Sequence, residues 1–431
     1  MNIKKFFALA KEKGIDTAEV SFNKSTAFSF SLFQGAIDSY EISTNSSYKA
    51  KGIYKDKLGI CRSENASEEY FVDSIIKNAS YIEKDEEAII FKGSEKYSHK
   101  NLYSKSLEAL DNETKIAKML ELEKYAYSLD SRVKNVEISY SDTEGTKTFT
   151  NTYGLNLKEK SNYYVIFLSV VIEENGEIKQ AYDAFFSNDP SEFKLEEFAK
   201  SVVDKGISML HCEIIASGTY KAVLNRDSVS SLLNAIVGHV CSDSVQKHVS
   251  KFEGKVGEQV VSNKLTVYEK PINKTVFASM FDDQGVACYN KTIFDKGVLT
   301  GYLYDLERAK KDNVESTGNS TGNGVGFDCL VVKPGKLSEE ELFEKVGNGL
   351  YITSLDGLHA GLNATSGDFS LQAQGYEIKD GKIRGALGLF TVSGNLFTIF
   401  NDILAVGNNS KLLLSSNTVP SIAIKHLKYS V

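Results

Sequence analysis

Tryptophan is absent from this sequence of 431 residues, and positive charge is in deficit. The lack of Trp does not exclude a substantial core, since 24 Phe and 22 Tyr supply aromatic bulk and 42% of the residues are hydrophobic. The net charge of −7 argues against a general affinity for nucleic acid, because binding to phosphates depends on clustered Lys and Arg. We therefore expect a folded globular protein with no nucleic-acid partner.

Cysteine is also scarce, and its five positions are widely spaced with no C-x-x-C pair: Cys61, Cys212, Cys241, Cys288 and Cys329. That pattern is typical of reduced thiols in a cytosolic protein and not of a disulfide framework. No apolar run approaches the length of a membrane span, and residues 1–14 predict a short Lys-rich amphipathic helix instead of a signal peptide. A cytoplasmic location without a membrane partner is the expectation.

The chain is longer than the size at which single hydrophobic cores usually divide, so two domains are expected. Residues 1–216 predict a mixed sheet-and-helix domain, because period-2 runs with short polar turns accompany amphipathic segments. Residues 217–431 predict a mainly β, barrel-like domain, since short strands there alternate with Gly-rich turns. The expected fold class of the whole chain is α+β.

Local patterns place several elements within this frame. Helices are expected at residues 67–82, 112–129 and 195–209, and strands near residues 28–32, 48–54, 58–62, 133–140, 146–150 and 163–172. Asn175-Gly176 predicts a tight hairpin, because a type I′ turn needs positive φ at both central residues. Ser338, with Glu341 three residues later, predicts a capping box at the start of a helix.

Residues 228–250 carry the pattern that bears most on function. They predict one continuous helix, entered through Asp227 or Ser228 as N-cap. Its apolar face is expected to consist of Val229, Leu232, Leu233, Ile236, Val237 and Val240.

Inside this segment, Asn234-Ala235-Ile236-Val237-Gly238-His239 resembles the His-Glu-x-x-x-His zinc motif of the TldD/PmbA metalloprotease family. Asn234 stands in place of the first histidine and Ala235 in place of the glutamate. A hydrolytic zinc needs about three protein ligands and a base for its water. An amide is a poor zinc ligand and a methyl group is none, so we expect neither catalytic residues nor bound metal in this chain. His239 alone remains as a candidate ligand.

Further blocks extend the resemblance over nearly all of residues 217–431, in the order that the family has. They are residues 281–285, 295–305, 316–319, 365–370, 375–378, 391–396 and 403–408, with a weaker block at residues 151–155. The block at residues 403–408, Ile-Leu-Ala-Val-Gly-Asn, is similar to the PmbA/TldE branch in particular.

The resemblance implies a two-domain cytosolic protein that belongs to a heteromeric protease. In such complexes one subunit, TldD, carries zinc, while its partner TldE, also named PmbA, does not. The complexes are expected to act on unfolded peptides, and an older name for the family is modulators of DNA gyrase. The catalytic branch also has a metal-ligating cysteine near its C-terminus, whereas the last cysteine here is Cys329. Two independent losses therefore place this chain in the partner class.

Potential ligands are densest around His239, where Cys241, Asp243 and His248 follow. On a continuous helix His239 and His248 would lie roughly 13 Å apart along the axis, which is too far to share one metal ion. Cys241 would point away from His239. We therefore favour a structural role for this cluster.

The adjacent acids Asp282-Asp283 cannot form a general acid/base pair in extended backbone, because consecutive side chains point to opposite faces. Turn formation before Gly285 is the favoured interpretation. From the family blocks, the candidates for a substrate cleft or a subunit interface are Asp282, Asp283, Gly285, Thr365, Gly367 and Asp368.

Three functional hypotheses follow. In the first and preferred one, the chain is a non-catalytic TldE/PmbA-like subunit that binds unfolded peptides beside a zinc-bearing TldD-like paralogue, and the sequence leaves open whether the chain alone forms a homodimer. In the second it is a self-sufficient metallopeptidase with an atypical ligand set around His239. In the third it regulates DNA gyrase or a toxin–antitoxin pair without proteolysis.

Overall fold

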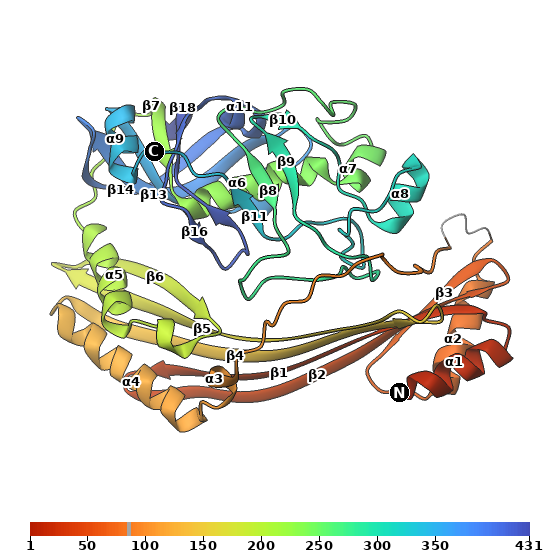
Figure 1. Cartoon of the computed structure of the whole chain (residues 1–431). Helices are drawn as coiled ribbons and strands as arrows, with labels where there is room; N and C mark the ends of the chain where they lie inside the picture. Colours follow the sequence, from red (N-terminus) through yellow and green to blue (C-terminus); the bar gives the residue numbers. More distant parts are fainter. Residues whose placement is uncertain (84–87) are drawn as a thin grey trace.

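The N-terminal part of the computed structural model is organised by one antiparallel sheet of six strands in the order β3-β2-β1-β4-β5-β6. The structure describes residues 1–83 and 88–431. The strands are β1 (Thr17–Phe33), β2 (Ala36–Tyr54), β3 (Lys57–Ser63), β4 (Val133–Asn151), β5 (Asn156–Glu174) and β6 (Glu177–Ser187). The four central strands are 17 to 19 residues long, and the sheet curls along their length, as Figure 1 shows.

Helices cover the ends of one face of this sheet. They are α1 (Ile3–Glu12), α2 (Glu68–Ser80), α3 (Lys105–Glu108), α4 (Asn112–Leu129) and α5 (Leu195–Ser208), with a 3-10 turn η1 at Pro190–Glu192. α1 and α2 pack on Ala18 and Val20 of β1, whereas α4 and α5 pack with Phe28, Phe30 and Leu32 of the same strand. Because side chains alternate along a strand, these residues share one face, and the other face turns toward the C-terminal part (Figure 1).

The expected helices at residues 67–82, 112–129 and 195–209 are confirmed, as is the hairpin, where Asn175 and Gly176 have φ values of 51° and 85°. The expected strands at residues 48–54 and 58–62 lie in β2 and β3, which pair as neighbours, but other strand bounds were too short. Residues 133–140 and 146–150, for example, both lie in β4, whose polar middle is hydrogen-bonded on both sides by β1 and β5. Backbone pairing from two neighbours keeps a strand extended where its side chains show no apolar alternation.

The C-terminal part contains a closed barrel of five strands, as its Gly-punctuated pattern predicts. The order is β14-β13-β12-β7-β18, closed by pairing between β14 and β18, and β15 extends the sheet from β18. These strands are β7 (Gly218–Leu224), β12 (Gly349–Asp356), β13 (Asp368–Lys379), β14 (Lys382–Asn395), β15 (Ile403–Val406) and β18 (Ile422–Ser430). The expected fold class, with a curled N-terminal sheet and a C-terminal barrel, is thereby confirmed.

A second C-terminal sheet has the order β10-β9-β8-β11-β17-β16. Its strands are β8 (Val267–Glu269), β9 (Lys291–Asp295), β10 (Val298–Leu299), β11 (Leu330–Val332), β16 (Lys411–Leu412) and β17 (Thr418–Val419). The helices of this part are α6 (Arg226–Val237), α7 (Ser242–Gln246), α8 (Leu306–Asp312), α9 (Glu339–Val346), α10 (Leu358–Gly361) and α11 (Leu396–Asn401), with a 3-10 turn η2 at Gly238–Val240. The capping box of α9 is present as expected.

α6 belongs to the largest hydrophobic core of the protein. Leu232, Leu233 and Ile236 are fully or almost fully buried in a cluster that also contains Ile352 of the barrel and Phe294 of the second sheet. Residues of both the barrel and the second sheet therefore pack around α6 in the C-terminal core. No helix among the described residues is long and apolar enough to cross a membrane.

Candidate functional site

The segment at residues 228–250 is not one helix, so that expectation was wrong. α6 is capped by Asn225, whose side chain accepts a hydrogen bond from the Ser228 N–H at 2.9 Å, and it ends at Val237. After the 3-10 turn, the backbone pairs with Leu303, whose N–H donates to Val240 and whose carbonyl accepts from Ser242. That pairing takes backbone groups which a longer helix would need, so the helix cannot continue. The separation of roughly 13 Å between His239 and His248 therefore does not apply, because it assumed one continuous helix through both residues.

The apolar face predicted for this segment is confirmed. Val229, Leu232, Leu233, Ile236, Val237 and Val240 are each exposed by 1% or less. The hydrophobic periodicity therefore identified the buried face correctly even though it overestimated the length of the helix.

Asn234, at the position of the first motif histidine, is engaged in an amide network. Its side-chain oxygen accepts a hydrogen bond from Asn417 Nδ2 at 2.8 Å, and the same nitrogen donates to Ser230 Oγ at 2.9 Å. Asn417 is 1% exposed, and its oxygen accepts from the Leu330 N–H at 3.1 Å. The network joins α6 to β11, and it uses the Asn234 oxygen for structure.

The other two motif positions also serve the core. The Ala235 methyl group packs against the main hydrophobic cluster. His239 is 5% exposed, its Nδ1 accepts from the Lys251 N–H at 3.3 Å, and its ring lies 5.0 Å from the ring of Phe397. Burial lowers the pKa of His239, and a backbone hydrogen bond with Ala364 opposes this only in part. The imidazole is held neutral by its surroundings.

The three positions do not fit a catalytic zinc. The Asn234 oxygen and the His239 Nδ1 atom each accept a hydrogen bond, and Ala235 offers no ligand atom. Across the described residues, no three His, Cys, Asp or Glu side chains come together in a way that would hold a metal ion. The geometry agrees with the chemistry of the side chains, which lack both the ligand number and the base.

The candidates at residues 365–368 lie beside His239. The Asn363 side chain accepts from the N–H groups of Thr365 and Ser366, which makes this segment a tight turn. Gly367 has a φ of 81°, and a Cβ atom there would lie 2.6 Å from the Phe397 ring. The Asp368 carboxylate accepts from Asn395 Nδ2 at 2.9 Å, which lowers the pKa of Asp368. The turn thus supports Phe397, which packs on His239.

The candidates at residues 282–285 lie against the N-terminal sheet. Asp282 is 5% exposed, and its carboxylate accepts from the N–H groups of Gln284, Val286 and Ser320 at 2.8–3.0 Å, so its interpretation as a turn residue is confirmed. Burial raises the pKa of Asp282 to about 6, although these three hydrogen bonds lower it. Asp283 points the other way and forms an ion pair with Lys147 of β4 at 2.8 Å.

Gly285 completes this contact between the two parts of the chain. Its carbonyl accepts from Tyr97 Oη at 2.7 Å, and a Cβ atom at this position would lie 2.6 Å from the Phe149 ring of β4. The positive φ of 80° and the close ring both call for glycine here. The structure therefore places Asp283 and Gly285 at a contact within the chain. Whether this block also meets a substrate or a second subunit stays a prediction.

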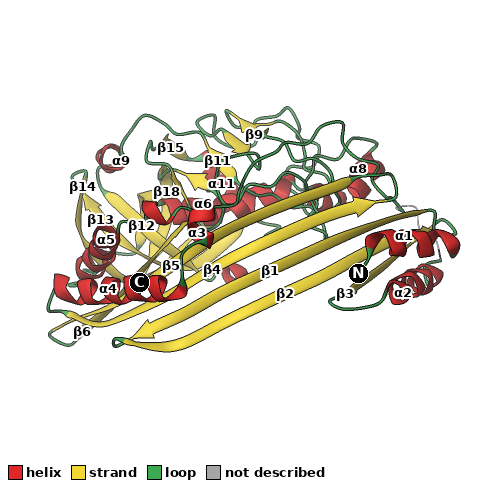
Figure 2. Ribbon diagram, turned by 60° about the horizontal axis from the view of Figure 1, so that its bottom comes forward, coloured by secondary structure: helices red, strands yellow, loops and turns green. Residues whose placement is uncertain are grey.

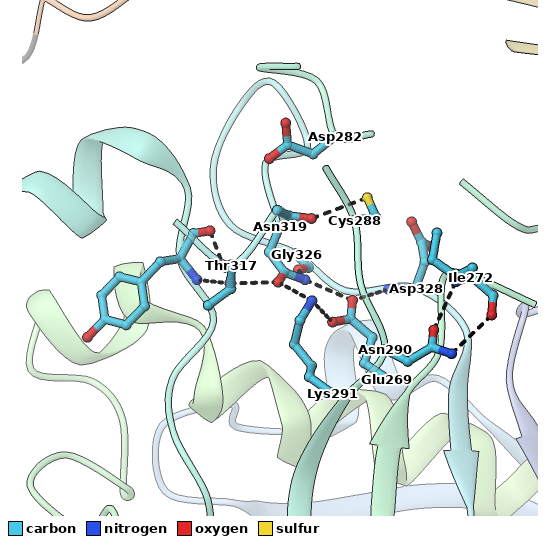
Figure 3. A network of polar contacts seen from close by, with 12 residues as sticks. Glu269, Ile272, Asp282, Cys288, Asn290, Lys291, Thr317, Asn319, Gly326 and Asp328 are labelled. Atoms are coloured by element: carbon cyan, nitrogen blue, oxygen red, sulfur yellow. Dashed lines mark hydrogen bonds and ion pairs between the residues drawn. The ribbon is translucent and has the colours of Figure 1, made fainter. Parts of the chain in front are cut away.

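A buried polar network near this turn was not predicted from the sequence. Figure 3 shows Lys291 and Asn319 meeting at Glu269, which is 2% exposed and accepts from both at 2.8 Å. Asn319 also donates to the Gly326 carbonyl and accepts from Thr317, which ties down both ends of a Gly-rich loop. The partners come from distant parts of the sequence, so local patterns could not predict the network. Only the family block at residues 316–319 marked part of it in advance.

A cleft lies between β6 and the C-terminal part, beside α6. One section of about 370 Å³ is lined by Gln180–Ala184 of β6, by Arg226, Asp227 and Ser231 of α6, by Thr353–Asp356 and by Leu412–Leu414. A second section of about 290 Å³ shares Gln180, Tyr182 and Thr353 with the first. We call these two sections the β6 cleft. It runs past the first turns of α6, where Arg226, Asp227 and Ser231 line it.

β6 offers an unpaired edge in this cleft. It is the last strand of its sheet, and its pairing partner β5 lies on one side only. Lys205 Nζ donates to the Tyr182 carbonyl from the other side, at 3.1 Å, which shows that the backbone of Tyr182 faces outward. Because backbone groups alternate in direction along an antiparallel strand, Gln180 and Ala184 also face the free side.

The fold and the motif together define a class of protein. A curled antiparallel sheet is joined to a closed barrel, and a core helix carries a degenerate metal-binding motif. Two family models match the chain, the PmbA/TldA metallopeptidase central domain at residues 105–210 and the C-terminal domain at residues 217–430. The chain belongs to the PmbA/TldD metallopeptidase family.

Similar proteins occur in bacteria and archaea. Metalloprotease PmbA of Escherichia coli O157:H7 is 24% identical over 91% of this chain and 88% of its own length. A metalloprotease of Methanocaldococcus jannaschii is 24% identical over 92% and 91%. The crystal structure of a proposed modulator of a DNA gyrase from Thermotoga maritima has a TM-score of 0.93 at 28% identity and covers 99% of both chains. TldE from Thermococcus kodakarensis, at 19% identity, shares the fold with a TM-score of 0.90 over the whole of both chains.

The Asp282 turn allows a first test with a neighbouring control. Asp282→Asn exchanges a carboxylate oxygen for an NH₂ group that cannot accept the Ser320 N–H, so we expect a loss of about 1–3 kcal/mol in the free energy of unfolding. Asp283→Asn removes only an ion pair of a 42% exposed side chain and is expected to cost roughly 0–1 kcal/mol. Urea denaturation of both variants measures the difference, and equal losses would contradict the turn assignment.

His239 allows a test by pH. Its pKa in the folded chain lies below the ordinary value of 6.5, so the unfolded chain binds a proton first as the pH falls. The stability that neutral His239 contributes is present above pH 6.5 and is lost progressively below it. His239→Gln keeps an acceptor and does not titrate, so its free energy of unfolding should fall less than that of the wild type between pH 7 and pH 5. Parallel curves for the two proteins would show that the ring titrates freely.

Proposed function

We propose that this chain is the non-catalytic, TldE/PmbA-like subunit of a cytoplasmic metalloprotease, and that a TldD-like, zinc-bearing paralogue performs the hydrolysis. The observation that carries the proposal is the use of the motif positions within the core. The Asn234 side-chain oxygen accepts a hydrogen bond from Asn417, and Ala235 packs against apolar side chains of the core. The His239 side chain is buried. A chain built in this way depends on a partner for any bond that it helps to cleave.

The role proposed for this subunit is to hold unfolded peptide beside the partner's active site. The β6 cleft suits an extended peptide, because backbone groups of Gln180, Tyr182 and Ala184 face outward and can pair with any sequence. The Tyr182 carbonyl now accepts from Lys205 and the Ala184 N–H donates to Asp183, so an added strand would replace these two side-chain bonds. A strand added at such an edge binds through its main chain. That mode of recognition fits a protease that acts on unfolded peptides with little sequence preference.

The charges of the cleft support the same interpretation. Its larger section is lined by three basic side chains, Lys205, Arg226 and Lys411, and by three acidic ones, Asp183, Asp227 and Asp356. Neither sign predominates, so the lining gives no electrostatic selection for acidic or basic peptides. Specificity would then rest on the unfolded state of the substrate.

Co-purification with a zinc-bearing paralogue tests the proposal directly. This chain and a paralogue that has an intact His-Glu-x-x-x-His motif are expressed separately and together, and each preparation is assayed for mass, zinc content and cleavage of an unfolded peptide. We expect a complex whose activity exceeds that of the paralogue alone, with no zinc and no activity in this chain by itself. A paralogue carrying His-Gln-x-x-x-His is the matched control, because it keeps the fold of the complex but lacks the base.

Other outcomes would replace the proposal. Stoichiometric zinc and chelator-sensitive peptidase activity in the isolated chain would make it a self-sufficient metallopeptidase. Association with gyrase or an antitoxin, with no paralogue in the complex and no cleavage, would make it a regulator.

The peptide-binding role has a test of its own. Ser354→Trp places a large side chain in the β6 cleft, and we expect it to weaken binding of a fluorescent unfolded peptide by about tenfold, or about 1.4 kcal/mol. Ser80→Trp, on exposed α2 at the far end of the sheet, is the control for the added indole. Fluorescence anisotropy measures binding, and the mass of the complex is checked in parallel. If Ser354→Trp binds the peptide with unchanged affinity, the peptide does not bind in the β6 cleft. The proposed role as a subunit of the protease would not be affected by that result.

A further inference from the structure

The second section of the β6 cleft, of about 290 Å³, contains large apolar side chains that are exposed. Ile178 and Tyr182 of β6 are 64% and 51% exposed, and Leu389 of β14 is 62% exposed. Figure 2 shows β6 at the same end of the molecule as the barrel strands β13 and β14. Because burial of such side chains lowers the free energy, their presence together in one concavity indicates a site for another molecule.

A β-bulge in β14 directs Leu389 into the cleft. On either side of it, Leu387 and Phe390 are 5% and 3% exposed and belong to the core of the C-terminal part. Residues three apart on a regular strand face opposite sides, so these two can both be buried only if the strand is irregular between them. The register against β13 shifts at this point, where two residues of β14 lie opposite the single residue Gln374. The bulge therefore buries both neighbours and leaves Leu389 exposed.

Ile178 and Tyr182 lie on one face of β6, because side chains alternate along a strand. Gln180 lies between them on the same face, and its backbone faces the free edge. A peptide strand that is added at this edge would place every second side chain beside this face. Such a side chain would lie between β6 and Leu389, since all of these residues line the same section.

Charge does not select between peptides in this section. Its two charged residues, Lys179 and Asp356, have opposite signs. The Lys179 ammonium group already pairs with Glu177 at 3.1 Å and donates to Cys212 Sγ at 3.0 Å. Neither sign of peptide charge is favoured, so the discrimination that this section offers is between apolar and polar side chains.

An exposed apolar side chain is what distinguishes an unfolded core segment from other extended chains. Large apolar residues are mostly buried in folded proteins and become accessible when a segment unfolds. Backbone pairing along β6 needs only an extended segment, so pairing alone treats a polar linker and an unfolded core segment alike. Apolar contacts in the second section would separate the two.

We propose that the second section of the β6 cleft selects extended peptide segments that carry a large apolar side chain, and that Ile178, Tyr182 and Leu389 contact this side chain. The proposal rests on the proposed function, because it assumes that peptide is held along β6. It adds a class of substrate, namely segments from unfolded hydrophobic cores, and it makes Leu389 a residue that determines specificity.

A pair of peptides tests the selection. Both are fluorescent, of equal length and built from Gly, Ser and Thr, with either Leu or Asn at the central position, since these two side chains are similar in size. We expect the wild type to bind the Leu peptide about tenfold more tightly in fluorescence anisotropy. In Leu389→Asn this preference is expected to fall below about threefold, with little change for the Asn peptide.

Ile60→Asn is the matched control for the substitution. Ile60 is 39% exposed on β3, which lies outside the cleft, and the same side chain is exchanged. We expect it to keep the wild-type preference for the Leu peptide. Circular dichroism checks that both variants retain the fold.

Cys212 reports where the selected side chain binds. It lines the second section and is half-buried, whereas Cys61, Cys241, Cys288 and Cys329 are buried, so iodoacetamide is expected to alkylate Cys212 first. At one concentration that saturates the site with the Leu peptide, we expect alkylation to slow at least about threefold, and the Asn peptide to protect less. Mass spectrometry locates the label, and Cys212→Ser is the control for labelling elsewhere.

The outcomes separate this proposal from the proposed function. If the wild type binds both peptides equally and Ser354→Trp weakens both, peptide is held in the cleft without apolar selection, and only this proposal is overturned. If the preference for Leu survives Leu389→Asn and Cys212 is not protected, the apolar side chain binds on another surface. If Ser354→Trp changes the binding of neither peptide, the proposed peptide-binding role of the cleft is overturned as well.

Discussion

The buried amide of Asn417 holds together the part of the molecule on which the rest depends. It donates to Ser230 and Asn234 of α6 and accepts from the backbone of Leu330 in β11. The polar side of an otherwise apolar helix is thereby satisfied inside the core, so α6 can be enclosed by the barrel and the second sheet. The same bonds engage the side-chain oxygen of Asn234, at the position of the first histidine of the zinc motif. One amide therefore serves the stability of the core at a position where the motif has a metal ligand.

The two parts of the chain are joined by contacts that leave a cleft open elsewhere. Lys147 and Phe149 of β4 meet Asp283 and Gly285, and the absence of a Cβ atom at Gly285 allows the close approach of the Phe149 ring. The buried Glu269–Lys291–Asn319 network lies near this turn, and through Ser320 the Gly-rich loop is bonded to Asp282. These contacts position the sheet against the barrel, and β6 then borders the cleft beside α6. The contact between the two parts of the chain and the β6 cleft therefore involve different strands of the same sheet.

Much of the fold could be read from local patterns, and the errors have identifiable causes. Periodicity found α4 and the buried face of α6, and Asn175-Gly176 specified its hairpin through backbone conformation. The strand bounds failed because β4 stays extended through a polar stretch where its neighbours pair with it on both sides. The helix from residue 228 failed because the backbone after Val237 turns to pair with Leu303. Both errors come from hydrogen bonds to residues far along the chain.

The sequence by itself determined the family, the fold class and the loss of the zinc motif, because these depend on which side chains are present at Asn234, Ala235 and His239. Only the tertiary structure decided what those side chains do instead. Asn417 reaches Asn234 across 183 residues, and Phe397 reaches the His239 ring from the far side of the core. The free edge of β6 likewise exists only once strand order is set. The chemistry of a side chain can be read from the sequence. Contacts between distant residues depend on strand order and chain closure, which form only in the folded protein.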